Sequence, residues 1–73
     1  MPPKPAPYRE VRRKLLAAGF VQVSQEGSHV KFMRITEKIT QTTTVPHHNE
    51  VASGTLRSIL RQSGITIDEW ERL

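Results

Sequence analysis

Residues 20–45, FVQVSQEGSHVKFMRITEKITQTTTV, decide the fold of this 73-residue chain. Three segments within this stretch, FVQVSQE, HVKFMRI and ITQTTTV, alternate apolar with polar residues or are rich in β-branched residues, which is typical of strands. Residues 25–28 and 36–38 are turn formers. Because both connections are short, we expect the strands to pair with their neighbours as a three-stranded antiparallel meander.

Alternation assigns the side chains of each strand to two faces of this sheet. In the second strand, Val30 and Phe32 share the face that helices should cover, and His29, Lys31 and Met33 share the opposite face. In the first strand, the same rule places Val21 and Val23 on one face and Gln22 and Ser24 on the other. The histidine is therefore expected outside the core, beside a lysine.

Helical patterns flank the strands on both sides. Tyr8, Val11, Leu15 and Ala18 recur at steps of three and four residues, and Gly19 follows as a stop signal. A second helix is expected over residues 54–63, ending at Gly64, and the spacing of Thr66 and Glu69 predicts a capping box for a short last helix. The predicted class is α+β in the order αβββα, with the helices on one face of the sheet and a short extra helix at the C-terminus.

Composition limits where the protein acts. Four of the five prolines lie in residues 1–7, which we expect to form a flexible tail before a single domain over residues 8–73. The chain has no cysteine and no apolar stretch long enough for a signal peptide or a membrane span, so a cytoplasmic protein without a membrane partner is expected. The three histidines lack the spacing of metal ligands, and no metal or other cofactor is expected.

The net charge of +4 and the clustering of Lys and Arg favour a polyanionic partner. Histidine has an ordinary pKa near neutrality, so His29 is the candidate general base for metal-independent cleavage of RNA, with Lys31 as the cation beside it. Ser28 and His29 do not form a nucleophile and base pair, because neighbours on a strand point to opposite faces. The residues alone also allow a solvated histidine on a domain that only binds RNA.

Three motifs in order, AAGFVQVSQEGSHVKF, TTTVPHHNE and SGTLRSILRQSGIT, make the chain resemble the HicA family of mRNA interferase toxins from type II toxin–antitoxin modules. The resemblance extends from about Tyr8 to Trp70. It implies a fold like that of a double-stranded-RNA-binding domain and an endoribonuclease whose catalytic histidine, in a Gly-Ser-His motif, corresponds to His29. The second histidine that many members carry is replaced here by Val30.

The resemblance also implies a partner, a HicB-type antitoxin whose acidic surface covers the histidine and the basic surface of the toxin. His48, from the Val-Pro-x-His motif, is a candidate for an auxiliary role. The residues expected to bind RNA are Ser28, Lys31, Arg57, Arg61, Arg12 and Arg13. The alternative function is a non-catalytic RNA-binding module of the same fold, but the second helix begins VASGTLR, without the lysine cluster that would favour it.

Overall fold

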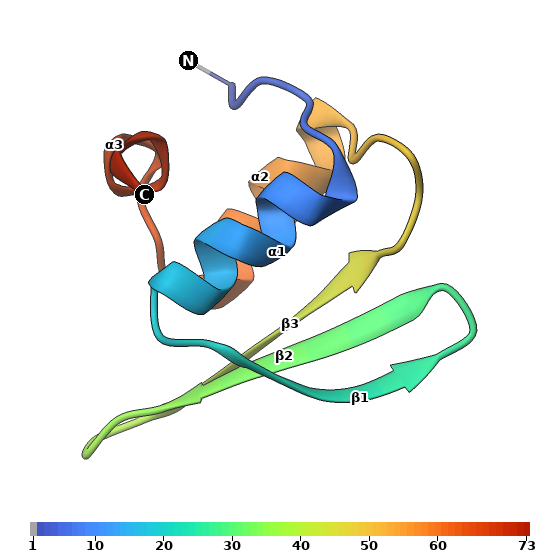
Figure 1. Cartoon of the computed structure of the whole chain (residues 1–73). Coiled ribbons are helices and arrows are strands. Elements are labelled where there is room, and N and C mark those ends of the chain that lie inside the picture. The colour runs from blue at the N-terminus through green and yellow to red at the C-terminus, as the bar shows by residue number, and fades with distance from the viewer. Residues whose placement is uncertain (1) are drawn as a thin grey trace.

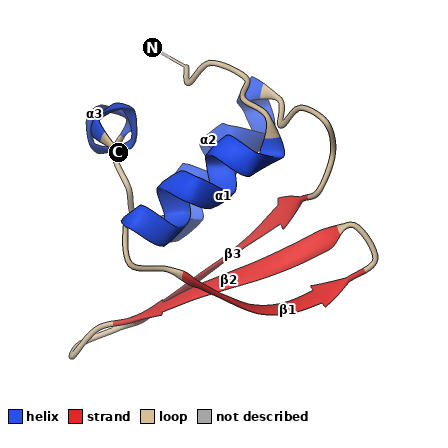
Figure 2. Cartoon of the chain, viewed as in Figure 1, coloured by secondary structure: helices blue, strands red, loops and turns tan. Residues whose placement is uncertain are grey.

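The computed structural model describes residues 2–73, so Met1, the first residue of the predicted tail, lies outside the described residues. The elements follow the order α1 (Tyr8–Ala17), β1 (Val21–Glu26), β2 (His29–Ile35), β3 (Thr40–Pro46), α2 (Ser53–Ser63) and α3 (Ile67–Arg72). Figures 1 and 2 show α1 and α2 side by side over one face of the sheet, with the other face uncovered. This arrangement confirms the predicted α+β class and its resemblance to a double-stranded-RNA-binding domain.

The sheet is an antiparallel meander in the order β1-β2-β3, with β2 in the centre. Alternation along β2 holds as predicted, because Val30 and Phe32 are completely buried whereas His29 and Lys31 are exposed. On β3, Val45 pairs with Val30 and also enters the core. The face of β2 opposite the helices therefore carries the polar candidates of the site.

Alternation fails on β1. Gln22 pairs with Phe32 and Ser24 pairs with Lys31, which leaves Val23 as an extra residue in a β-bulge. Gln22 and Ser24 consequently do not share a face, contrary to the sequence expectation. All six residues of β1 are exposed, because β1 forms the edge of the sheet that the helices leave uncovered.

The core lies between the helices and the covered face of the sheet. Helix α1 ends where Gly19 adopts a positive φ of 97°, and the Phe20 N–H donates to the Leu15 carbonyl at 3.0 Å, which directs the chain into β1. The buried hydrophobic cluster consists of Val11, Leu15, Phe20, Val30, Phe32, Val45, Val51, Leu56, Ile59, Leu60, Ile65 and Trp70.

Arg34 lies on the helix side of β2 and joins four elements of the fold. Its guanidinium donates to the carbonyl of Ala18 at 2.9 Å, to Gln41 Oε1 from Nε at 2.9 Å, and to the carbonyl of Ser63 at 3.3 Å. It also lies over the ring of Phe20, 4.7 Å from the centroid. These contacts tie β2 to β3 and to the C-terminal ends of both long helices.

The last helix has the predicted capping box. The Thr66 hydroxyl accepts from the Glu69 N–H and the Glu69 carboxylate accepts from the Thr66 N–H, both at 3.1 Å. The second of these bonds lowers the pKa of Glu69. The box orients α3 so that Trp70 is buried, and Lys14 Nζ fixes α3 to α1 by donating to the Trp70 carbonyl at 2.9 Å.

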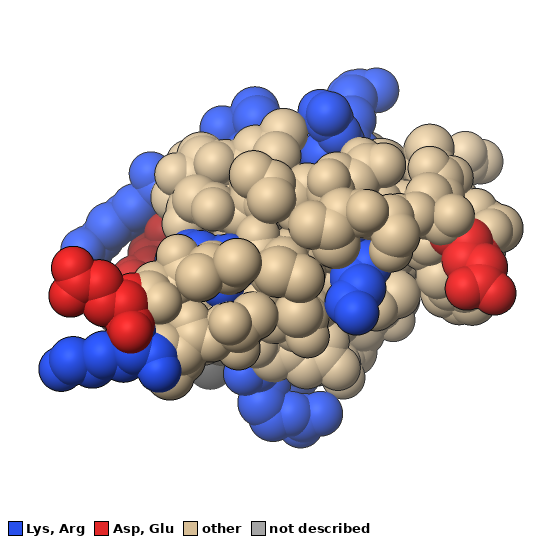
Figure 3. All heavy atoms as spheres, turned by 90° about the horizontal axis from the view of Figure 1, so that it is seen from below, with Lys and Arg blue, Asp and Glu red and all other residues tan. Residues whose placement is uncertain are grey.

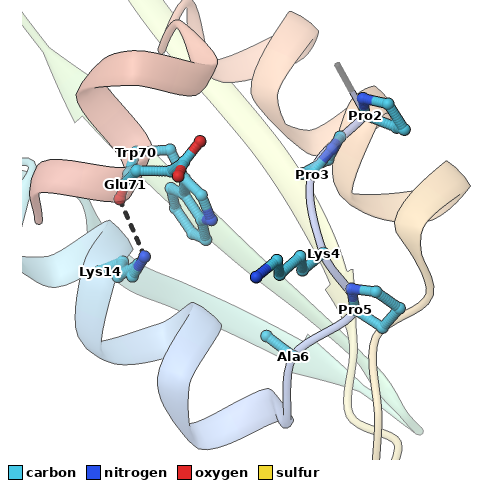
Figure 4. Close-up of a pocket in the computed structure, with 8 residues that line it drawn as sticks. All are labelled: Pro2, Pro3, Lys4, Pro5, Ala6, Lys14, Trp70 and Glu71. Atoms are coloured by element: carbon cyan, nitrogen blue, oxygen red, sulfur yellow. Dashed lines mark hydrogen bonds between the residues drawn. The ribbon is translucent and has the colours of Figure 1, made fainter.

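The proline-rich segment before α1 is attached to the domain at two points. Ala6 pairs with Val51 through N–H···O bonds of 3.1 and 2.7 Å, and the Ser53 hydroxyl donates to the Pro3 carbonyl at 2.6 Å. Figure 4 shows this segment passing Trp70, with a pocket between them. Within this segment Pro3 is buried. The flexibility of residues 1–7 stays a prediction.

Candidate functional site

His29 is the first residue of the central strand and lies on the uncovered face of the sheet. It is exposed, and its direct neighbours across the two ladders are Glu26 on β1 and Pro46 on β3. Lys31 follows on the same face, between Ser24 and Thr44. An imidazole and an ammonium group are thus held on one rigid strand, both open to a ligand as large as a nucleic acid.

Figure 3 looks onto this uncovered face. Most of the surface is uncharged, Lys and Arg side chains lie around its rim and also stand within it, and Asp and Glu side chains appear only towards its two ends. Thr40, Thr42 and Thr44 occupy the β3 side of this face by the register of the sheet. An anionic ligand can therefore approach this face, and Glu26, the β1 neighbour of His29, places one carboxylate at its end.

The Gly-Ser-His turn and the loop after β3 lie against each other. The backbone N–H of His47 donates to the Ser28 carbonyl at 2.6 Å, which extends the β2–β3 pairing by one bond beyond Pro46. Two motifs that are distant in the chain are brought to one end of the sheet in this way. His48 is exposed in the same loop.

The start of α1 completes this end of the molecule. The rings of Tyr8 and His47 are stacked, with centroids 3.9 Å apart and planes at 23°. Partial burial raises the pKa of Tyr8, and the positive charge of Arg12, one turn further along α1, opposes this shift. A shallow pocket of about 280 Å³ lies here, lined by Pro7, Tyr8, Arg9, His47, His48 and Asn49.

The remaining predicted RNA-binding residues lie elsewhere. Arg57 and Arg61 are exposed on α2, in the helix layer and therefore on the opposite side of the sheet from His29. Arg13 is paired with the Glu10 carboxylate and also donates to the Leu73 carbonyl at 3.3 Å, so it faces the C-terminus. Ser28, His29 and Lys31 thus lie together at the start of β2, and the loop that carries His48 is hydrogen-bonded to Ser28, whereas Arg12 lies beside Tyr8 on α1, in the helix layer.

Sequence reasoning missed the contribution of Tyr8, Arg9 and His47 to this end of the molecule. Tyr8 is part of the apolar stripe of α1 and does pack against the core, so its second contact was not indicated by periodicity. The adjacent residues His47 and His48 gave no indication in the sequence of which imidazole ring would stack on another side chain. The signal that could have revealed it is the ladder itself, since pairing Pro46 with His29 puts residue 47 beside the turn at residue 28.

Two further properties concern the described residues 2–73. No group of three or more His, Cys, Asp and Glu side chains is placed to hold a metal ion. None of the helices in this part of the chain is both long and apolar enough to cross a bilayer.

Comparisons with known proteins identify the family. A search of curated proteins found no match to this chain. The family model described as the HicA toxin of bacterial toxin–antitoxin modules matches residues 8–65, which is well over half of the chain and contains all the motifs of the site. This chain therefore belongs to the HicA toxin family, and its place in a toxin–antitoxin family implies an antitoxin as its partner.

Proposed function

We propose that this toxin is an endoribonuclease, an mRNA interferase, in which His29 is the general base. The observation that supports this most directly is the position of His29, exposed on the uncovered face of the central strand with Lys31 on the same face. Histidine is suited to proton transfer at neutral pH. Membership of the HicA family points to the same residue through the Gly-Ser-His motif.

The reaction needs only groups that the chain, the RNA and water supply. His29 takes the proton of a ribose 2′-hydroxyl, the 2′ oxygen forms a bond to the adjacent phosphorus, and the bond from phosphorus to the 5′ oxygen breaks. The leaving 5′ oxygen takes up a proton from water, so the products are a 2′,3′-cyclic phosphate and a 5′-hydroxyl. Lys31 stabilises the additional negative charge on the phosphate oxygens in the transition state.

The proposed RNA-binding residues fall into two groups. Ser28 and Lys31 lie beside His29 on β2 and its preceding turn, where they bind RNA next to the scissile phosphate, and Arg12 binds a phosphate from α1. Arg13, Arg57 and Arg61 bind phosphates of the RNA further from the cleavage site. For Arg13, the phosphate must replace the Glu10 carboxylate as its partner. His48 is proposed as an auxiliary residue because its loop is hydrogen-bonded to the Gly-Ser-His turn.

The proposed inhibitor is a HicB-type antitoxin in the cytoplasm. An acidic surface on it would complement the basic side chains around the uncovered sheet face and would cover His29. An inhibitor that occupies this face would prevent RNA from binding and would also prevent His29 from reaching a 2′-hydroxyl. Excess antitoxin should therefore abolish both RNA binding and cleavage.

The test is cleavage of a long transcript by wild-type protein and by His29→Ala. We expect a loss of at least roughly 100-fold, the usual contribution of a general base, with an unchanged thermal unfolding midpoint because His29 is exposed. Thr42→Ala, on the same face of the neighbouring strand, is the matched control and should retain activity. The product ends are analysed for the cyclic phosphate, and the reaction is repeated in excess EDTA.

Several results would contradict this function. Full activity of His29→Ala would remove the histidine from the mechanism, and a dependence on added Mg²⁺ or Mn²⁺ would overturn the metal-independent route. Tight RNA binding by the wild type without any cleavage would instead favour the non-catalytic RNA-binding module.

A further inference from the structure

We propose that His47, supported from behind by Tyr8, is a stacking platform for one unpaired base of the RNA. This inference rests on the proposed function, because it takes RNA as the substrate. It adds that the substrate is single-stranded at this position, since a base can stack on a side chain only when it is not paired in a duplex.

The two rings are arranged as a fixed platform. Their centroids lie 3.9 Å apart with planes at 23°, so one face of the His47 ring is covered by Tyr8. Tyr8 is half-buried and packs against the hydrophobic core, whereas His47 is exposed. The covered face of the imidazole is thus held by a side chain that cannot move freely, and the opposite face is available to a ligand.

The backbone of His47 is held as firmly as its ring. Its N–H donates to the Ser28 carbonyl at 2.6 Å, and the preceding residue, Pro46, pairs directly with His29. Neighbouring strands are about 4.8 Å apart and successive residues advance by about 3.3 Å. The backbone of His47 is therefore close to that of His29, while its ring, one residue beyond Pro46, turns towards Tyr8 on the helix side.

The chemistry around the platform fits a nucleotide. The pocket of about 280 Å³ beside it is lined by both loop histidines, Arg9 and Asn49, and none of its lining residues is acidic. Arg12 is close enough to influence the titration of Tyr8. A base on the aromatic face with its phosphate near these arginines is the usual combination in single-strand recognition, and it is tolerant of sequence because every base has a π-face.

The test measures stacking directly, using the His29→Ala protein throughout so that the RNA stays intact. The probe is a short single-stranded RNA with one 2-aminopurine, moved base by base along the oligonucleotide, because the fluorescence of this base is quenched when it stacks. We expect one position to be quenched on binding. His47→Ala should abolish this quenching and weaken affinity by about tenfold, the order of magnitude for one stacked base.

Three variants separate stacking from support of the loop. His47→Phe retains an aromatic face and should retain the quenching, with affinity close to that of the parent. His47→Leu retains a side chain of similar size against Tyr8 but offers no aromatic face, so it should lose the quenching as the alanine variant does. Thr42→Ala, on the exposed β3 surface, is the matched control and should change neither. Thermal unfolding shows that each protein is folded.

The outcomes distinguish this proposal from the function on which it rests. RNA binding that is equally tight and equally quenched in His47→Ala or His47→Leu would overturn the platform and leave the ribonuclease intact. Absence of RNA binding by any variant, together with absence of cleavage by the wild type, would overturn both. If His47→Ala lost only its affinity for the antitoxin, the stacked pair would be a protein-binding surface and the proposal would be wrong.

Discussion

Lys31 and Arg34 lie on the same strand, three residues apart, and carry the same charge, yet their surroundings have little in common. Lys31 is exposed on the uncovered face of the sheet beside His29. Arg34 points the other way, donates to two backbone carbonyls and to Gln41, and lies over the ring of Phe20. Lys31 is therefore accessible to a ligand, whereas the guanidinium of Arg34 is hydrogen-bonded within the protein.

The comparison shows that a count of basic residues does not measure a binding surface. Arg34 and Lys14 both contribute to the net charge of +4, but their side chains hold elements of the fold together. Alternation along a strand separates the two roles, because an odd step along β2 changes the face. The planar guanidinium of Arg34 suits several fixed acceptors at once, whereas a lysine on an open surface acts as a single mobile charge.

The largest expected effect is on catalysis. Lys31→Ala should slow single-turnover cleavage at saturating RNA by about 100-fold, the order of magnitude for removal of one transition-state donor. Arg34→Ala, measured at a temperature where it is folded, should change this rate by only a few-fold. Equal effects of the two substitutions on the saturated rate would show that the strand places them alike with respect to the scissile phosphate.

The second effect is on the free energy of unfolding, where Arg34→Ala should have the larger effect and Lys31→Ala the smaller one. Arg34→Ala should lower the free energy of unfolding by about 2–3 kcal/mol, because the carbonyls of Ala18 and Ser63 lose a charged donor. Lys31→Ala should change it by no more than about 0.5 kcal/mol, as is usual for exposed residues. Urea unfolding of both variants measures the difference, and a stable Arg34→Ala protein would mean that the network is dispensable.

Gly64→Ala tests the same network from the helix side. Gly64 ends α2 with a φ of 72°, and a Cβ there would collide with the amide group of Gln41, which accepts from Arg34. A cost of about 1–2 kcal/mol in the free energy of unfolding is expected from the backbone conformation. Gly54→Ala is the matched control, since no atom lies near its Cβ position and alanine favours a helix. It should be neutral or stabilising.

The smallest effects are expected for Arg57→Ala and Arg61→Ala. Both residues are exposed on α2, on the other side of the sheet from His29, so they should influence only binding. Each substitution should lower the slope of log affinity against log salt by about one without changing the saturated cleavage rate. A salt titration in the His29→Ala protein measures the slope. An unchanged slope would show that α2 does not contact RNA.

Much of the architecture could be predicted because it depends on local patterns. The alternation of Val30 and Phe32 with His29 and Lys31 identified the faces of β2, and the Thr66–Glu69 spacing identified the cap of α3. The second helix begins at Ser53, one residue earlier than predicted. The sequence did not indicate this start because the N-cap residue, Ala52, has no side chain that could cap the helix.

Features that depend on tertiary contacts could not be predicted in the same way. The bulge at Val23 inserts one residue into a strand that alternates well in sequence, and only the pairing with Lys31 reveals it. The stack of Tyr8 on His47 joins the start of α1 to the loop after β3, and nothing in either segment indicates the other. The face that carries His29 and Lys31 was predicted from sequence because both lie within one strand, whereas the stack of Tyr8 on His47 needs two segments.

The uncovered edge strand has a consequence for where motion occurs in this protein. All residues of β1 are exposed, and β1 has a neighbour on one side only, whereas β2 is held by ladders on both sides. Local opening is least costly where few buried contacts are lost, so amide protons of β1 should exchange with solvent well before those of β2. The histidine is therefore expected to belong to the slowest-exchanging strand of the sheet, where the ladder to β3 still holds its backbone when β1 opens.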